Sequence, residues 1–266
     1  MANKIIISPS RLAIHSSSGR TFTNRRSAGF TLVELLTVLA IISVLTAVVV
    51  PAMNGMKDAD NITNASYTVA GELQRARAYA MAHNTYVWVG FYEEAANAQS
   101  PTNVFPYTGE GRLVMGLAAS VDGTDIFAAG ASPATIPASR LMPIDKLIKI
   151  QNVHVTDIGA PTGTGTPLES RPNGAFNGQT SEQYGINSDN ATEETLYPFA
   201  LDSYTFYKTV CYSPTGEAII DGNPALRRVG EIDLRLTHGT TVSANSSNVV
   251  AIQFTGIGGG VQTYRN

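Results

Sequence analysis

The sequence predicts an α+β protein in which one long N-terminal helix packs on a largely antiparallel β-sheet. Residues 30–50 form an apolar stretch that carries a single acid, Glu34. Beyond Pro51 the chain turns polar, yet apolar residues keep recurring at three- and four-residue steps, as on one face of a helix. From Thr85 the pattern changes to short runs of β-branched and aromatic residues that end in Gly or Pro turns, which is typical of antiparallel hairpins.

The apolar stretch at residues 30–50 is long enough to cross a hydrocarbon core of about 30 Å at about 1.5 Å per helical residue. The residues before it contain several basic side chains and no acid: Lys4, Arg11, Arg20, Arg25 and Arg26. The positive-inside rule therefore predicts a cytoplasmic N-terminus and an exported C-terminal part. A charge in hydrocarbon costs about 2.5–3.5 kcal/mol on insertion scales, so Glu34 is a functional-site hypothesis.

A secretory signal is the alternative interpretation of this segment. Such a signal has a shorter apolar region that ends at a small-x-small site. Here the stretch ends in Val-Val-Val-Pro at residues 48–51, whereas the small residues 27–29 lie on its basic side. A protease is therefore expected to cut before the stretch and to leave the helix on the mature protein.

The second part of the helix is predicted to be amphipathic and to end at His83 and Asn84. Its apolar positions are Ala59, Ile62, Ala65 or Ser66, Val69, Leu73, Ala76 and Ala80. Arg75 and Arg77 lie near its end, where basic side chains complement the helix dipole. Pro51 lacks a backbone donor and clashes with the preceding turn, so we expect a kink around residues 48–55.

Short strand candidates follow the helix. They lie at residues 86–92, 112–117, 148–156, 203–212, 217–220, 231–237, 249–254 and 260–264. Residues 213–216 and the glycine-rich residues 256–260 predict tight turns, and residues 159–194 indicate a long surface excursion. Cys211 is the only cysteine, so it cannot form an intrachain disulfide, and we interpret it as a small hydrophobe buried in a strand.

Enzyme signatures in the sequence are thin. No zinc-protease, Walker A or nucleophile-elbow motif occurs, so no catalytic residue, metal or cofactor is expected. The histidines lack ligand spacing and are interpreted as ordinary surface or partly buried residues: His15, His83, His154 and His238.

Two polar clusters in the sequence are candidate binding sites. The acidic loop at residues 187–194 offers oxygen ligands for calcium but lacks the spacing of a known calcium loop, so a solvated turn is favoured. Arg227, Arg228 and Arg265 could form a phosphate-binding patch. The net charge of -3 and the lack of interleaved aromatic residues favour a solvated face instead.

The residues before and inside the start of the apolar stretch form the most specific motif. Residues 25–34, Arg-Arg-Ser-Ala-Gly-Phe-Thr-Leu-Val-Glu, resemble the cleavage and N-methylation motif of type IV prepilins and type II secretion pseudopilins. The resemblance implies that a prepilin peptidase cuts between Gly29 and Phe30 and methylates the new amino terminus of Phe30. It also implies that Glu34 meets such a terminus in the filament and that Pro51 kinks the helix. A plain single-span anchor would explain the hydropathy but not this combination.

Two further segments are similar to the GspH/FimT-type minor pseudopilins. Residues 72–89 resemble their helix-to-strand junction, and residues 210–216 resemble one of their strand-and-turn segments. Residues 93–202 are left uncovered. The leader is long for the superfamily, which favours a later translation start.

The resemblance implies four parts and a structural function. The parts are a cytoplasmic leader (1–29), a transmembrane helix (30–50), its amphipathic continuation (51–84) and a β-rich domain outside the inner membrane (85–266). The expected fold is pilin-like. The expected function is that of a minor pilin or pseudopilin in a type IV pilus-like or type II secretion filament. The expected partners are prepilin peptidase, other pilin or pseudopilin subunits, the inner-membrane assembly platform and membrane lipid.

Two alternatives stay open. A DNA-binding minor pilin would use Arg227, Arg228 and Arg265, although nucleic acid is not an expected partner. A membrane-anchored exported enzyme would need a site within residues 93–202. The sequence does not specify the kind of filament, nor whether the subunit is major or minor.

Overall fold

The structure is a computed structural model that describes residues 29–103, 105, 107–124, 135–156, 186, 198–219, 229–242 and 248–265. Of residues 50–55 and 229 it describes the backbone alone. The chain divides into two compact units, Met1–Val49 and Val50–Asn266. The N-terminal apolar helix and a large antiparallel sheet together give the α+β, pilin-like architecture that the sequence predicts.

Helix α1 (Leu32–His83) provides all the described helical structure of the first unit. Its segment Leu32–Val49 has a mean hydropathy of 2.6 and no buried residue. By length and composition this segment can cross a membrane, although a signal sequence would pass the same test.

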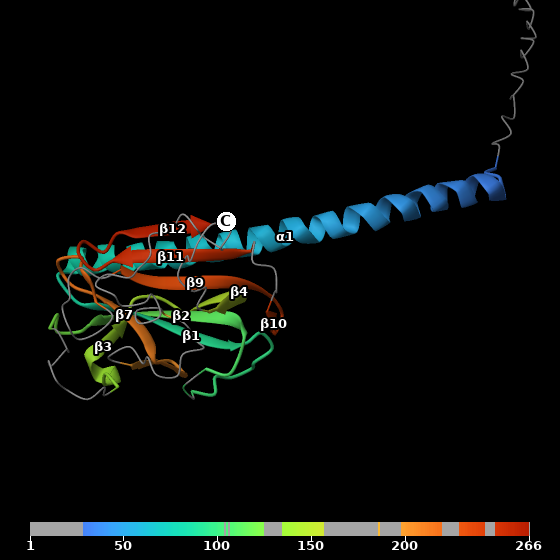
Figure 1. The fold of residues 1–266 in the computed structure, drawn as a ribbon. Coiled ribbons are helices and arrows are strands. Elements are labelled where there is room, and N and C mark those ends of the chain that lie inside the picture. The colour runs from blue at the N-terminus through green and yellow to red at the C-terminus, as the bar shows by residue number, and fades with distance from the viewer. Residues whose placement is uncertain are drawn as a thin grey trace, which may run out of the picture. The chain divides into compact units, whose positions relative to one another are not determined.

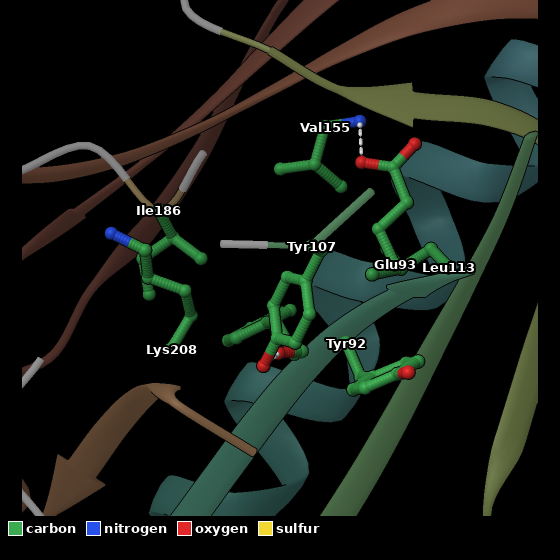
Figure 2. A pocket seen from close by; sticks show the side chains of 8 residues that line it. Tyr92, Glu93, Tyr107, Leu113, Val155, Ile186 and Lys208 are labelled. Atoms are coloured by element: carbon green, nitrogen blue, oxygen red, sulfur yellow. Dashed lines mark hydrogen bonds between the residues drawn. The ribbon is translucent and has the colours of Figure 1, made fainter. Parts of the chain in front are cut away.

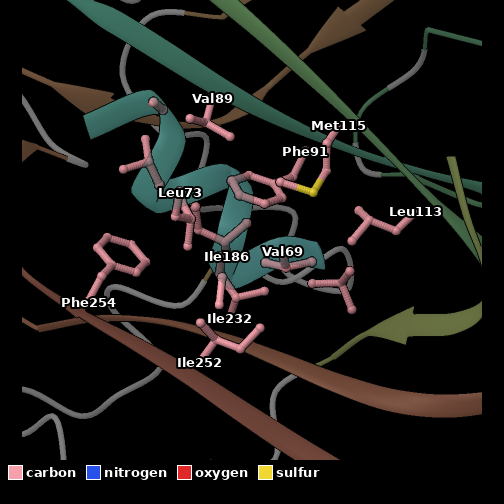
Figure 3. Close-up of a cluster of buried hydrophobic side chains, with 14 of the residues drawn as sticks. Val69, Leu73, Val89, Phe91, Leu113, Met115, Ile186, Ile232, Ile252 and Phe254 are labelled. Atoms are coloured by element: carbon pink, nitrogen blue, oxygen red, sulfur yellow. The ribbon is translucent and has the colours of Figure 1, made fainter. Parts of the chain in front are cut away.

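The second part of α1, within the second unit, packs on the sheet through one apolar face (Figure 1). Ile62, Ala65, Val69, Leu73, Ala76 and Ala80 are buried, as the spacing predicts. They pack against side chains from the facing strands, among them Phe91, Leu113 and Ile232 (Figure 3). The helix ends where Asn84 adopts φ 50°, a left-handed conformation that asparagine tolerates better than most residues, so the expected stop is confirmed.

The described strands form one ten-stranded sheet and a separate two-stranded sheet. Their bounds are β1 (Val87–Ala95), β2 (Gly111–Ser120), β3 (Leu141–Pro143), β4 (Ile148–Val155), β5 (Phe199–Leu201), β6 (Tyr204–Phe206), β7 (Lys208–Tyr212), β8 (Ala218–Ile219), β9 (Val229–His238), β10 (Thr241–Val242), β11 (Val249–Thr255) and β12 (Val261–Arg265). The large sheet has the order β12-β11-β9-β4-β2-β1-β7-β8, with β10 beside β9 and β3 beside β2. Every strand pair is antiparallel; a 3₁₀ turn (Ala138–Arg140) precedes β3.

A second hydrophobic cluster lies on the other face of the sheet, under the β5–β6 hairpin. Gly90 of β1 pairs with Gly116 of β2, and Phe206 of β6 packs over both: a Cβ added at Gly116 would lie 2.9 Å from its ring. A buried carboxylate, Glu94, links the layers. Its Oε1 lies 2.9 Å from Arg112 Nε, an ion pair rather than a directed hydrogen bond, and it accepts a hydrogen bond from the hydroxyl of Tyr204.

Residues 203–212 were predicted as one strand, and this prediction is wrong. They form β6 and β7, which belong to different sheets. The chain changes sheet at Tyr207, whose backbone N–H donates to the hydroxyl of Tyr107 instead of to a neighbouring strand. The predicted turn at residues 213–216 is confirmed by the hydrogen bond from Gly216 N to Ser213 O.

The large sheet is curled, and one corner of β8 meets the turn after β11. Ala218 N donates to Gly256 O (2.9 Å) across this contact. Arg77 of α1 donates a hydrogen bond to Gly216 O, just before β8 (3.3 Å). Together these two hydrogen bonds link the end of the helix, β8 and the glycine-rich turn. That turn, predicted from residues 256–260, is confirmed by the hydrogen bond from Thr255 N to Gly260 O.

Candidate functional site

The candidate site begins where α1 begins. Gly29, Phe30 and Thr31 precede the first helical residue, Leu32. Glu34 N donates to Thr31 Oγ1 (3.1 Å), and Leu35 N donates to Thr31 O (3.1 Å). Thr31 is therefore the N-cap of α1, and Glu34 occupies the third helical position, which is the spacing of a capping box. Sequence analysis missed this role of Thr31, although a Thr three residues before a Glu was a visible signal.

Glu34 lies exposed in the first turn of α1. A carboxylate is favoured there, because the unsatisfied N–H groups give the helix N-terminus a partial positive charge. Among the described residues Glu34 forms no ion pair. The local structure thus orients the acid but leaves its carboxylate available to a cation from outside this part of the chain.

The peptide bond between Gly29 and Phe30 lies outside the helix, on the exposed side of the cap. The Phe30 side chain is 80% exposed, and a Cβ added at Gly29 would meet no atom within 4 Å. A bond in this position can be presented to a protease in extended form without unwinding α1.

The first part of α1, on both sides of Glu34, carries large exposed apolar side chains. They include Leu32, Val33, Leu35, Leu36, Leu39, Ile41, Ile42, Val44, Leu45 and Val48. Burying one such side chain is worth about 1.5–3 kcal/mol, so a helix of this composition requires lipid or other apolar helices around it.

Pro51 lies inside α1, and the helix continues through it without interruption. Its side chain is outside the described residues, so the kink at Pro51 stays a prediction. The boundaries of the leader, the membrane segment and the exported domain likewise stay predictions.

The β domain contains a cluster of buried polar side chains, which we compare with an enzyme site. Glu93, Tyr107 and Lys208 line a cavity that encloses about 10 Å³ (Figure 2). This is room for about one water molecule. Glu93 accepts from Val155 N (3.1 Å) and lies 2.8 Å from His154 Nδ1. The arrangement is therefore a structural link between β1 and β4.

Tyr107 confirms this structural character. Burial raises the pKa of its hydroxyl well above the ordinary value, so the group stays protonated. It donates to Phe91 O (3.0 Å) and accepts from Tyr207 N (2.9 Å), which joins β1 to the segment before β7. Among the described residues no group of His, Cys, Asp and Glu side chains could hold a metal ion.

A larger hollow of about 340 Å³ lies beside the C-terminal end of α1. Its lining includes His83, Ser120 and Asp122. Hydrogen bonds from Thr124, and then from Ser120, hold the pKa of Asp122 well below its ordinary value, and Arg140 lies 3.2 Å away. These bonds use the carboxylate to fix the loop after β2, and among the described residues no second acid lines the hollow.

The predicted binding clusters can be placed only in part. Arg227, Arg228 and the loop at residues 187–194 lie outside the described residues. Arg265 is described, and its guanidinium donates to Thr63 Oγ1 and to Ala59 O of α1. It therefore ties the last strand to the helix. His15 also lies outside the described residues; His83 stacks on Tyr79, His154 pairs with Glu93, and His238 lies 3.7 Å from Asp58.

Comparison with known proteins identifies the N-terminal segment. Residues 24–50 match the family model of the prokaryotic N-terminal methylation motif. No curated protein and no solved structure matches the chain. The similarity to GspH/FimT-type proteins, which rests on residues beyond the match, stays a prediction. The matched residues include Gly29, Phe30 and Glu34, and the motif supports a membrane-anchored, processed subunit of the type IV pilin or pseudopilin kind.

Proposed function

We propose that this chain is a minor pilin or pseudopilin, cut by prepilin peptidase between Gly29 and Phe30 and assembled into a filament through α1. The observation that carries the proposal is the combination of the methylation motif with a helix start at which the cut bond is exposed and Glu34 lies within the first turn. The single-span anchor and the secretory signal require neither feature.

The cut creates a positively charged amino terminus one residue before the N-cap Thr31. This charge lies at the positive end of the helix dipole, which is an unfavourable place for a cation. Methylation retains the charge. A carboxylate such as Glu34 from a neighbouring subunit can offset it, and the pairing also favours one axial register between the two helices.

The exposed apolar side chains of Leu32–Val49 provide the remaining cohesion. In the membrane they face lipid, and in the filament they face the equivalent helices of other subunits. The β domain, joined to the second part of α1 by a continuous core, would be displayed outside the inner membrane. The assembly platform that moves subunits from the membrane into the filament is the further partner that this function requires.

The test measures the charge of Glu34 separately from its shape. We compare Glu34→Gln and Glu34→Val with wild type in cells that produce the filament, and quantify the subunit in sheared filaments and in membranes. Leaving one charge of a buried pair unmatched costs about 3–5 kcal/mol, so both variants should enter filaments less than wild type by a factor of at least about a hundred, while membrane insertion and cleavage continue.

Thr31→Val is the matched control, because it removes the cap hydroxyl and leaves the charge of Glu34 unchanged. Its loss of helix stability is about 1 kcal/mol, and it should enter filaments far better than either Glu34 variant. Incorporation of Glu34→Gln at the wild-type level would remove the proposed charge pairing.

A further inference from the structure

The hollow of about 340 Å³ beside the C-terminal end of α1 has no part in the proposed processing or assembly. Its walls are the last turn of α1 with the stop at Asn84, the end of β2 with the loop after it, and one residue of β3. The volume is at the lower end of the range of about 300–1,000 Å³ that is usual for small-molecule sites. The helix between Val50 and His83 is roughly 50 Å long at about 1.5 Å per residue, so a ligand outside a membrane can reach the hollow.

The helix wall of the hollow carries a pair of stacked rings that the fold holds in place. Tyr79 packs against the main hydrophobic cluster, and the exposed ring of His83 stacks on it with the centroids 4.1 Å apart and the planes at 28°. On the strand side, Val121 and Met142 are exposed apolar residues that also line the hollow. The hollow therefore offers a flat, rigid surface on which the C–H groups of a ligand can pack.

The strand wall carries polar groups that hydrogen bonds hold in fixed positions. The carboxylate of Asp122 accepts from Ser120 Oγ (2.8 Å) and from Thr124 N (3.1 Å). Thr85 Oγ1 donates to Ser120 O (3.0 Å), which joins this wall to the chain just after α1. Because these groups are already oriented, a ligand that bonds to them has little ordering to bring about, and preorganisation of this kind favours binding.

The charge at the hollow is compensated. Asp122 is the acid among the described lining residues, and its Oδ2 lies 3.2 Å from a guanidinium nitrogen of Arg140. The other polar side chains there include the carboxamide of Asn84 and the imidazole of His83. A carboxamide and a neutral imidazole each offer both a donor and an acceptor, so they suit hydroxyl groups, which also do both.

We propose that this hollow binds a neutral carbohydrate, in the form of a pyranose ring or a short chain of such rings. One C–H face of the ring packs on the stacked pair of Tyr79 and His83, and hydroxyls at its rim bond to the carboxamide of Asn84 and to the carboxylate of Asp122.

The chemistry of the walls selects this class of ligand over others. A simple inorganic ion has no flat C–H face to place on the rings, and the pairing of Asp122 with Arg140 leaves it little charge to bind. An acyl chain has no hydroxyls for the polar groups. A pyranose combines a C–H face with a rim of neutral donors and acceptors, as the hollow requires.

The experiment titrates the full chain, in a detergent without a sugar headgroup, with cellobiose, a disaccharide of two glucose rings with C–H groups on both faces. Amide chemical shifts are followed by NMR up to roughly 50 mM probe, because an open site of this kind should bind with a Kd on the order of 1 mM. Saturable shifts are expected at residues 83–85 and 119–123. Sorbitol, which has the hydroxyls without a ring face, is the matched control probe and should give none.

Three substitutions test the named groups. His83→Ala removes the stacked ring and should raise Kd for cellobiose about threefold to tenfold, whereas His83→Phe, which keeps a flat ring, should bind nearly as wild type does. Asn84→Gly removes the carboxamide but allows the same left-handed backbone, and it should raise Kd by a similar factor. Tyr67→Ala is the matched control, because it removes an exposed ring of α1 that does not line the hollow, and it should leave Kd unchanged.

The proposal is overturned if cellobiose causes no saturable shifts at these amides, if sorbitol acts in the same way, or if His83→Ala and Tyr67→Ala both bind as wild type does. Saturable shifts at the same amides with calcium chloride or methylguanidinium chloride, but not with cellobiose, would overturn it in favour of a cation site. None of these outcomes depends on cleavage at Gly29 or on Glu34, so the hollow and the filament assignment fail separately.

Discussion

Gly90→Ala tests the packing of the two layers, because its expected effect is opposite to the ordinary effect of adding a methyl group to glycine. A Cβ at Gly90 would lie 2.6 Å from Phe206 Cβ, roughly 1 Å closer than the distance at which carbon atoms are in contact. Phe206 is fully buried, with the rings of Phe199 and Tyr204 at centroid distances of 5.1 and 6.2 Å, so it has little room to move.

Overpacking of this kind costs about 1–3 kcal/mol. At roughly 2–4 °C per kcal/mol for a domain of this size, Tm should fall by about 4–8 °C for a loss near 2 kcal/mol. The assay is thermal unfolding of the full chain in detergent, followed by circular dichroism. Because alanine is intrinsically favoured over glycine within a strand by roughly 0.5–1 kcal/mol, a loss of stability can come only from the clash with Phe206.

Gly71→Ala is the matched control. Gly71 lies exposed within α1, and a Cβ added there would meet no atom within 4 Å. This variant should be more stable than wild type by about 0.5–1 kcal/mol. In a Phe206→Gly background, which removes the Cβ of residue 206 as well as its ring, Gly90→Ala should cost little or nothing more. An unchanged or raised Tm for Gly90→Ala in the wild-type background would refute the described packing of β6 over β1.

Three further predictions concern the core and its polar links. Leu73→Ala should lower the free energy of unfolding by about 3 kcal/mol in urea titrations, because Leu73 is fully buried under the sheet; a loss below 1 kcal/mol would contradict that burial. Glu94→Gln should cost about 3 kcal/mol at pH 7, since it leaves Arg112 without its buried counter-charge, and Arg112→Met together with Glu94→Gln should cost less than the two changes added. The lowered pKa of Asp122 means that its ionised form stabilises the fold above the ordinary pKa of 3.8, and that this contribution is lost as pH falls. The difference in Tm between wild type and Asp122→Asn should therefore be present at pH 7 and shrink at low pH, and a difference independent of pH would contradict it.

Much of the fold could be predicted from the spacing of apolar residues along the chain. The helical face at Ile62, Val69 and Leu73 and the long strands β1, β2, β9 and β11 are specified by local patterns that match their burial. Local sequence signals also identified the stop at Asn84 and the glycine-rich turn. These features depend on residues close together in the chain.

The second layer could not be predicted in the same way. Its strands β5 and β6 have three residues each, too few to show a period. Phe206 has room above the sheet because Gly90 of β1 and Gly116 of β2 are paired. That register is determined by the pairing of the whole sheet and not by local sequence. The division of residues 203–212 likewise depends on Tyr107, which lies about a hundred residues away in the chain.

The candidate site shows the same contrast. Gly29, Phe30 and Glu34 were identified from a linear motif, and the cap formed by Thr31 could have been identified from its spacing to Glu34. The direction of the Thr263 backbone groups in β12 was not predictable, because it depends on the register with β11.

The mature N-terminus is the most direct test of the proposed function. The chain should be purified from cells with an active prepilin peptidase and measured by intact and N-terminal-fragment mass spectrometry. Gly29→Val serves as control, because a Cβ added at Gly29 meets no described atom within 4 Å, so the change is expected to act on recognition by the peptidase. The account predicts a wild-type chain that begins at N-methylated Phe30 and a Gly29→Val chain that keeps its leader. A wild-type chain with an intact leader, or one cut after the apolar segment, would contradict it.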